Sequence, residues 1–416
     1  MGPLSGLRIV ELTTAWAGPM AGRILAFLGA EVIHVESATR LDSWRQHGQV
    51  FSPYRYPRDG KGERPWNRVA NFNSQNVNKL SLTLDLKLPG GNGVLLKLLA
   101  KSDVLLSNFT PGTLTRLGLS YDELKVICPD IIVAEMPAFG LAGPMAHGPA
   151  IGPTMEMAAG MASMIGYPGG PPTTTGPTYL DPMGAFHGAA AVLTALLYRR
   201  RGGGGQHVEI PQVEAAMHYI GEHILHAIAT GEDPQPMGNQ TPWAAPHGMF
   251  PAAGDDQWIA IAVRDDAEFE ALCEVMEHPG LVRDSRFATL PSRLQHQDEL
   301  ESAVADWTRC QDKHQAAERL QSGGVPAAPV NDAAEAVASR YLAHRAHFTE
   351  LMHPEIGVVP HEGLPFRLVA TPGGQDRAAP CLGQDTDMIL RDILELSEAE
   401  IVELVRTGTI SADPPP

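Results

Sequence analysis

The segment LRIVEL at residues 7–12, the helical pattern through Arg23 to Leu28 and the segment EVIHVE at residues 31–36 decide the fold of this chain. The two runs of aliphatic and β-branched residues are typical of strands, and the pattern between them is typical of a helix. A strand, a helix and a second strand in this order form a βαβ unit, whose strands are parallel. We therefore expect a parallel sheet that begins near the N-terminus.

The same alternation continues along the chain. Strand-like segments LSLTLDL (80–86), DVLLSN (103–108) and DIIVAEM (130–136) are separated by helical patterns at 92–100 and near 121–126. A helix rich in small residues follows from Pro182 to Arg200, and four glycines, Gly202 to Gly205, lead into the strand-like QHVEI. Alternating strands and helices predict a doubly wound α/β domain.

The chain of 416 residues exceeds the size at which a single core keeps growing, so we expect more than one domain. A helix from about Val213 to Thr230 leads into the proline-rich segment DPQPMGNQTPWAAPHGMF (233–250). We predict a large domain over 1–229, a smaller α+β domain over 230–325 with the strand QWIAIAV and three amphipathic helices, and a return to the large domain with C-terminal helices over 326–416.

Composition excludes several classes of partner. A formal net charge of −17 with dispersed basic residues predicts no nucleic-acid partner. The longest apolar stretches, near 155–165 and 188–198, are shorter than the roughly 20 residues that cross a bilayer, so we expect no membrane. The start MGPLSGLRIVEL lacks the pattern of a secretory signal, and four scattered cysteines are typical of reduced thiols. We expect a cytoplasmic protein.

Three glycine or histidine patterns argue against common cofactors. Gly18 and Gly22 are four residues apart with Pro19 in the turn, which departs from the dinucleotide-binding spacing and instead predicts close packing of a helix on the sheet. The run Gly202 to Gly205 lacks the Lys-Ser or Lys-Thr of a phosphate loop. The histidines between 218 and 226 lack the spacing of a helical zinc site, so we predict no metal.

The segment LDPMG at 180–184 is open to two interpretations. Asp181 could simply be a helix N-cap with Pro182 at the first helical position. However, helix N-terminal amides also favour an ionised carboxylate, which is the nucleophilic form. From these residues alone the helix cap is the favoured interpretation, so the case for a nucleophile depends on other observations.

The order of motifs along nearly the whole chain resembles the class III (CaiB/BaiF-type) CoA-transferases. The resemblance is carried by GLRIVELTTAWAGPMAGRILAFLGAEVIHVE, NVNKLSLTLDLK, SNFTPGTLTRLGLSYDEL, PAFGLAGP, LDPMGAFHGAAAVLTALLYRRRGGGGQHVEI, GVPAAPVND and LGQDTDMIL. It implies a Rossmann-like large domain with a smaller α+β domain, in an interlocked homodimer. The function that it implies is transfer of coenzyme A from an acyl-CoA to a free carboxylic acid, with succinyl-CoA as a generic donor.

The resemblance also implies site residues. Asp181 matches the family nucleophile, on which a mixed anhydride and then an aspartyl-CoA thioester form as covalent intermediates. Coenzyme A enters as a substrate, and no prosthetic group is implied. Its contacts are expected at nine positions: Trp16, Ala17, Leu84, Asp85, Leu86, Lys87, Asn108, Phe109 and Arg116. Lys87 or Arg116 would supply the positive charge that a phosphate needs.

Departures from the family leave two alternatives. Racemases that act on 2-methylacyl-CoA pair an aspartate with a histidine, whose place is taken here by Ile151, although His147 is close in sequence. Trp16 replaces a glutamine of the formyl-CoA transferases, and Pro149 replaces a lysine that contacts coenzyme A in them. Racemase activity is the first alternative, and a catalytically silent CoA-binding protein is the second.

Overall fold

The computed structural model describes residues 1–46, 56–57, 60–176, 178–411 and 413–414. Its chain divides into two compact units. Unit 1 comprises Met1–Ala162, Thr174–Thr230 and Ala343–Pro416, and unit 2 comprises Ser163–Thr173 and Gly231–Leu342.

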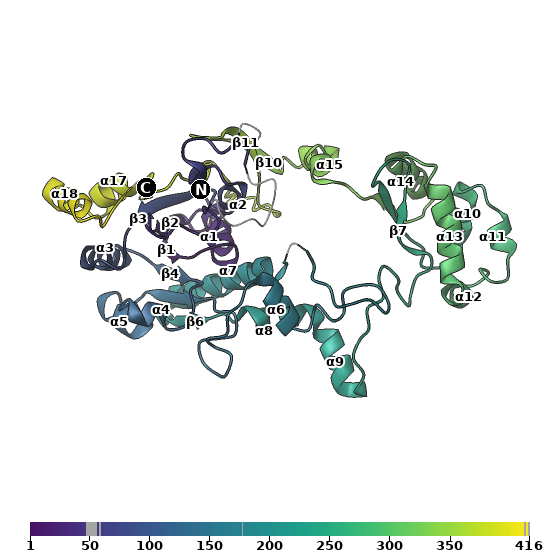
Figure 1. Ribbon diagram of the computed structural model, residues 1–416, viewed down its shortest axis with the longest axis horizontal. Helices are drawn as coiled ribbons and strands as arrows, with labels where there is room; N and C mark the ends of the chain where they lie inside the picture. The colour runs from purple at the N-terminus through teal and green to yellow at the C-terminus, as the bar shows by residue number, and fades with distance from the viewer. Residues whose placement is uncertain (47–55, 58–59, 177, 412, 415–416) are drawn as a thin grey trace. The chain divides into compact units, whose positions relative to one another are not determined.

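A six-stranded sheet forms the centre of unit 1 (Figure 1). Its strands lie in the order β3-β2-β1-β4-β5-β6 and all neighbouring pairs are parallel. The strand bounds are β1 Arg8–Leu12, β2 Glu31–Glu36, β3 Lys79–Thr83, β4 Val104–Ser107, β5 Ile132–Glu135 and β6 His207–Glu209. The parallel sheet expected from the βαβ pattern is therefore confirmed.

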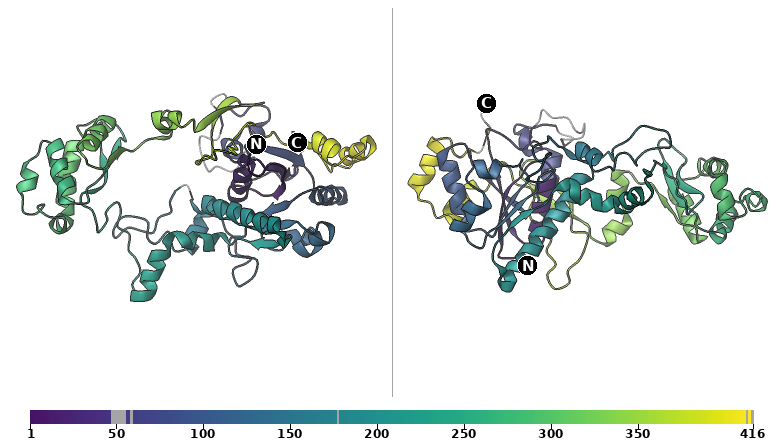
Figure 2. Two further views of the ribbon diagram at one scale, coloured as in Figure 1. Left: turned by 180° about the vertical axis from the view of Figure 1, so that it is seen from behind. Right: turned by 90° about the horizontal axis from the view of Figure 1, so that it is seen from below.

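Helices cover both faces of this sheet because its side chains alternate between two cores. Val10 of β1 faces a cluster that includes α3 (Pro89–Leu99), α5 (Tyr121–Ile127), η4 (Ile389–Ile393) and α18 (Glu398–Arg406). Ile9, the residue before it, faces a second cluster formed with α1 (Ala17–Phe27) and α7 (Leu180–Tyr198). Figure 2 shows the yellow C-terminal helices beside the blue helix α3.

Two glycines allow α1 to lie close to the sheet. A side chain at Gly18 would come within 2.7 Å of the Thr13 side chain and 2.8 Å of Asn108 Cγ. One at Gly22 would collide with the carboxylate of Glu11 on β1. The expectation that these glycines serve close packing is confirmed.

Shorter elements complete unit 1. They are η1 Pro65–Asn67, α2 Ala70–Gln75, α4 Thr113–Arg116, α6 Gly152–Ala158, the π-helical turn η2 Arg199–Gly203, α8 Gln212–Met217, η3 His218–Ile220, α9 Gly221–Thr230 and α17 Thr386–Met388. The strands β10 Phe348–His353 and β11 Gly357–Glu362 form an antiparallel hairpin. The short helix α16, Arg340–His344, straddles the boundary between the two units.

Unit 2 has a three-stranded antiparallel sheet in the order β7-β8-β9, with bounds His247–Pro251, Trp258–Ala262 and Ala327–Pro329. Its helices are α10 Asp266–Val275, α11 Gly280–Arg283, α12 Leu290–Gln295, α13 Gln297–Thr308, α14 Lys313–Ser322 and α15 Ala333–Val337. The sequence pattern predicts one strand and three helices here, which is too few. Strand β7 lies at the end of a proline-rich segment and β9 has three residues, so neither carries a clear alternation.

One helix is long and apolar enough to cross a membrane by length and composition, among the described residues. It is α7 with its π-helical extension, Leu180–Gly203. Eight residues of α7 are buried, several of them in the core shared with α1 and the sheet, as in the core helix of a soluble protein.

Candidate functional site

Most of the residues expected to contact coenzyme A follow the carboxyl ends of parallel strands. Trp16 and Ala17 follow β1, the stretch 84–87 follows β3, and Asn108 and Phe109 follow β4. The strand order reverses between β1 and β4, and open α/β sheets bind ligands in the crevice at such a reversal. This edge of the sheet is therefore the candidate ligand-binding edge.

Asn108 ties together the two loops at the reversal. Its Oδ1 accepts a hydrogen bond from Thr14 N at 2.9 Å, and its Nδ2 donates to Thr14 O at 2.9 Å. Trp16 follows as the N-cap of α1, and its ring lies 5.5 Å from that of Trp44, centroid to centroid. Asn108 thus holds the loop that presents Trp16.

Residues 84–87, which follow β3, can offer a ligand mainly backbone groups and one cationic side chain. Leu84 is buried in the core, and its N donates to Glu36 O at 2.8 Å. Asp85 is engaged by Thr39 Oγ1 at 3.1 Å and by Lys87 N at 3.0 Å. The side chain of Lys87 is exposed.

Of the other expected contact residues, Ala17 and Phe109 face the protein core, whereas Arg116 on α4 is exposed. The guanidinium of Arg116 donates to Thr113 Oγ1 at 2.8 Å. Within the described residues neither Lys87 nor Arg116 has an ion-pair partner. Both cations are therefore free to meet an anion.

Asp181 is the second residue of α7, not its N-cap. Tyr179 occupies the cap position without a side-chain cap, so the prediction of an Asp181 cap with Pro182 first is wrong. The helix starts earlier because the chain turns at Thr178, where φ is +56°, and Leu180 is already helical. Asp181 nevertheless lies in the first turn, where the helix dipole favours an anion.

The carboxylate of Asp181 occupies space that Gly152 leaves open. A side chain at Gly152, the first residue of α6, would collide with Asp181 Oδ2 and would come within 2.8 Å of Thr178 Cβ. The first turns of α6 and α7 therefore meet at this point.

Burial, together with the nearby charge of Glu156, raises the pKa of Asp181 to about 6. Both causes penalise the ionised form. A carboxylate with a pKa near 6 is still mostly ionised at neutral pH, and it is more basic than an ordinary aspartate. Such a group suits nucleophilic catalysis.

Ile151, at the position where the racemases have a histidine, caps α6 directly before Gly152. Its side chain is exposed and apolar. This arrangement places no second acid or base at residue 151, beside the turn that faces Asp181.

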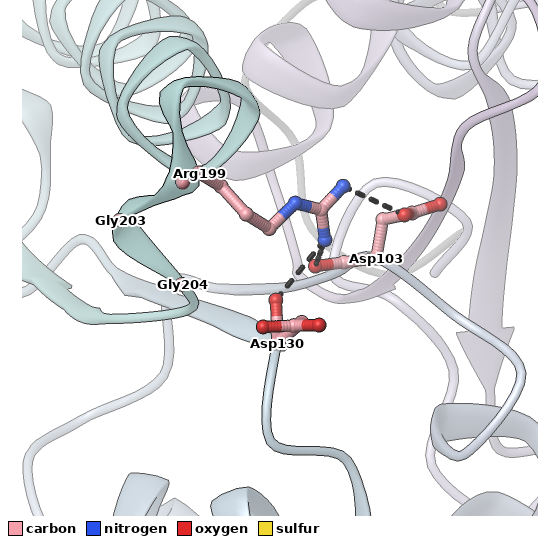
Figure 3. Close-up of a pocket in the computed structure, with 6 residues that line it drawn as sticks. Asp103, Asp130, Arg199, Gly203 and Gly204 are labelled. Atoms are coloured by element: carbon pink, nitrogen blue, oxygen red, sulfur yellow. Dashed lines mark hydrogen bonds and ion pairs between the residues drawn. The ribbon is translucent and has the colours of Figure 1, made fainter.

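A cavity of about 540 Å³ lies at the amino ends of the strands, opposite the candidate ligand-binding edge (Figure 3). It is lined by Asp103, Asp130, Arg199 and the glycines 202–204, which all precede strands. Arg199 points between the two acids, with Nη2 at 2.7 Å from Asp103 Oδ1 and Nη1 at 3.0 Å from Asp130 O. Its guanidinium is thus already engaged, and the cavity lies away from the carboxyl ends of the strands.

The sequence analysis missed three residues near Asp181. Gly152 lies against its carboxylate, Glu156 raises its pKa, and Thr175 donates hydrogen bonds to Glu156. One signal was available for Glu156, because it is the lone charged residue of the otherwise apolar segment GPTMEMAAGM. A charge within an apolar helical stretch indicates either an exposed position or a buried group with a role.

Comparison with known proteins gives consistent matches over nearly the whole chain. The model of the CoA-transferase family III matches residues 4–386. Succinyl-CoA–D-citramalate CoA-transferase of Chloroflexus aurantiacus is 34% identical over 402 residues, which cover 97% of this chain and 96% of that protein. Succinate–glutarate CoA-transferase of Agrobacterium fabrum is 29% identical, with 98% of each chain covered. A crystal structure of a CAIB/BAIF family protein from Brucella suis has a TM-score of 0.85 and 30% identity, over 94% of this chain and 99% of that one.

Proposed function

This chain belongs to CoA-transferase family III and is a CoA-transferase of that class, and we propose that it moves coenzyme A from an acyl-CoA to a free carboxylic acid by covalent catalysis at Asp181. The observation that carries the nucleophile assignment is the Asp181 carboxylate itself. It lies in the first turn of a long helix, against the backbone of Gly152, with its pKa raised to about 6 by burial and by Glu156.

The proposed reaction is a sequence of acyl exchanges that needs no net proton. The Asp181 carboxylate attacks the thioester carbonyl, the C–S bond breaks, and an aspartyl-acyl anhydride and CoA thiolate form. The thiolate then attacks the aspartyl carbonyl of the anhydride, which releases the donor acid as its carboxylate and leaves an aspartyl-CoA thioester. The acceptor carboxylate reverses both steps with its own acyl group, and Asp181 leaves as a free carboxylate. Burial of Asp181 helps because water would hydrolyse the anhydride.

We propose that coenzyme A binds along the carboxyl edge of the sheet, which has the strand order of the Rossmann class. Lys87 and Arg116 are exposed cations without ion-pair partners in the described chain, and each could pair with a phosphate. Ala17 and Leu84 are buried, so their contribution would come from backbone groups. Trp16 would border the acyl portion.

The names of the relatives suggest the substrate class. Those reported above are named for succinyl-CoA with D-citramalate and for succinate with glutarate, which are all dicarboxylic acids or their thioesters. We propose succinyl-CoA as donor and a dicarboxylic acid as acceptor.

A homodimer is supported by α9, which has no buried residue in the chain's own fold. Leu225 and Ile228 of this helix are 67% and 77% exposed. An isolated helix of ten residues is marginal in water, so a partner surface that covers its apolar side is expected. We propose that a second copy of this chain covers it in an interlocked cytoplasmic homodimer, in which units 1 and 2 are the large and small functional domains.

The experiment is mass spectrometry of acyl-CoAs after incubation with isotope-labelled free acids. Wild-type protein is expected to move label from glutarate or citramalate into a new acyl-CoA in the presence of succinyl-CoA, whereas Asp181→Ala is expected to lose the transfer. Full turnover by Asp181→Ala would overturn the nucleophile assignment. Epimerised 2-methylacyl-CoA without label would instead support a racemase, and binding without exchange would support a silent CoA-binding protein.

A further inference from the structure

Glu156 is a fully buried acid on the helix that faces Asp181. It lies on α6, four residues after Gly152, so both residues project from the same side of this helix. Its carboxylate accepts hydrogen bonds from Thr175 N at 3.0 Å and from Thr175 Oγ1. A buried carboxylate is costly unless its oxygens are satisfied, and here one threonine satisfies both.

Thr175 connects Glu156 to the start of α7. Its hydroxyl oxygen accepts a long hydrogen bond from Tyr179 N at 3.4 Å, and Tyr179 is the cap residue two positions before Asp181. The chain between them contains Thr178, whose side chain lies beside Gly152. Two contacts therefore join α6 to the first turn of α7: Glu156 through Thr175, and Gly152 through Thr178 and Asp181.

The hydrogen-bond donors to Glu156 in the described chain are neutral, so its negative charge stays uncompensated by a cation there. This charge and burial together raise the pKa of Asp181. Other titratable side chains on elements packed against α6 and α7 are engaged with other groups, exposed, or distant. The engaged ones are Arg23, which pairs with Glu362; Glu135, which pairs with His207; His187, which contacts Met183 O and stacks on His218; and Glu209, which accepts a hydrogen bond from Leu141 N. Glu214 is exposed, and Arg199 to Arg201 follow the far end of α7.

We propose that Glu156 is a positioning residue that acts on Asp181 in two ways, through its contact with Thr175 and through its uncompensated charge. The contact sets the first turn of α7, so the Asp181 carboxylate faces the backbone of Gly152. The charge makes that carboxylate more basic and hence a better nucleophile. This inference rests on the proposed function of Asp181.

The test compares three variants by the pH dependence of kcat/KM for CoA transfer. Glu156→Gln keeps the shape and an oxygen that accepts from Thr175, but it removes the charge. We expect its acid limb to move from about pH 6 toward the lower pH of an ordinary aspartate, with a lower kcat at pH 7.5. Glu156→Asp keeps the charge but shortens the reach to Thr175. We therefore expect its acid limb to stay near the raised pH of wild type, with a reduced kcat. Glu214→Gln removes an exposed carboxylate from α8 and should leave profile and rate unchanged.

A second measurement reads the pKa of Asp181 without any turnover. The difference in unfolding free energy between proteins with and without Asp181→Asn changes with pH between the unfolded and the folded pKa of Asp181, and it levels off above the folded pKa. We expect Glu156→Gln to lower the pH at which this difference levels off. If Glu156→Gln leaves both the kinetic midpoint and this pH unchanged, the inference is overturned. If wild type transfers no label but this pH still moves, the proposed function fails and the influence of Glu156 on Asp181 stands.

Discussion

At the scale of single residues, Gly152 determines where the Asp181 carboxylate can lie. We predict that Gly152→Ala lowers kcat by about 100-fold, because the new methyl group would occupy the space of Asp181 Oδ2 and displace the nucleophile by roughly 1 Å. KM for the acyl-CoA should change little, since the expected coenzyme contacts follow other strands. Gly93→Ala is the matched control, because a side chain at Gly93 on α3 meets open space. Steady-state kinetics of both variants test this, and equal rates would contradict it.

The raised pKa of Asp181 also affects stability. Because its pKa is about 6 when folded and near 3.8 when unfolded, the folded state binds more protons between these values. The contribution of Asp181 to stability is therefore present below pH 4 and is lost as the pH rises through 6. We predict that Asp181→Asn raises the free energy of unfolding at pH 7.5, by up to on the order of 3 kcal/mol, and has little effect at pH 4.

Urea unfolding of wild type and Asp181→Asn at both pH values measures this difference. Asp42, whose pKa burial raises to about 6 as well, is present in both proteins and does not contribute to the difference. A variant that is less stable than wild type at pH 7.5 would show that the carboxylate is held favourably after all.

Sequence alone reaches Asp181 only through its family resemblance, because a carboxylate near a helix start is more often a cap. It cannot reach Glu156 or Gly152 as parts of the same site. Their relation to Asp181 depends on the packing of α6 against α7, and the described residues of the connection between the two helices contain no helix or strand. Local patterns carry no information on that packing.

At the scale of elements, buried polar contacts join three neighbouring strands. Lys79 Nζ on β3 lies 2.6 Å from Glu11 Oε1 on β1, and His34 Nδ1 on β2 lies 2.7 Å from the same oxygen. All three side chains are fully buried. Burial alone would raise the pKa of Glu11, but Lys79 and His34 hold it below its ordinary value.

We predict that Lys79→Met lowers the free energy of unfolding by about 3–5 kcal/mol, because it leaves the Glu11 carboxylate buried without its cation. Adding Glu11→Gln should recover part of this loss, since the charge that needed compensation is then gone. Urea unfolding at pH 7.5 measures both effects, and a double-mutant cycle gives their coupling. If the free energy of unfolding of Lys79→Met alone were within about 1 kcal/mol of that of wild type, water would have to reach Glu11.

The central strands were predictable from sequence because each is a short run rich in aliphatic residues, as is typical of strands buried on both faces. The segments 7–12, 31–36, 103–108 and 130–136 each contain one observed strand. The helical segment after Val213 is less regular than its pattern indicates, since α8, η3 and α9 follow one another. Strand β9 pairs with β8 across a long separation, and such pairing leaves little trace in a local pattern, whereas β7 and β8 are neighbours in sequence and form a hairpin.

At the scale of the whole chain, the C-terminal segment closes the edge of the unit 1 sheet. Strand β3 is an outer strand, so no neighbouring strand pairs with the amides on its outer side. Two of them, Ser81 N and Thr83 N, instead donate to Asp385 Oδ2 at 2.9 Å and to Thr386 Oγ1 at 3.1 Å. Arg377 in turn holds Asp385 at 2.6 Å. Unpaired edge strands promote aggregation, so residues some 300 positions later protect the sheet that begins at the N-terminus.

The exposed apolar side of α9 leads to a prediction about assembly. We expect the wild-type protein to have twice the 44.6 kDa mass of the chain in light scattering, because a second copy would cover Leu225 and Ile228. The double substitution Leu225→Glu with Ile228→Glu should weaken this association and lower CoA transfer with it, since charges at a buried apolar contact are costly. Val126→Glu on α5 is the matched control, because Val126 is similarly exposed on a different helix of unit 1. A monomeric wild type that retains full transfer activity would show that α9 meets solvent or another partner, and that one chain contains the complete site.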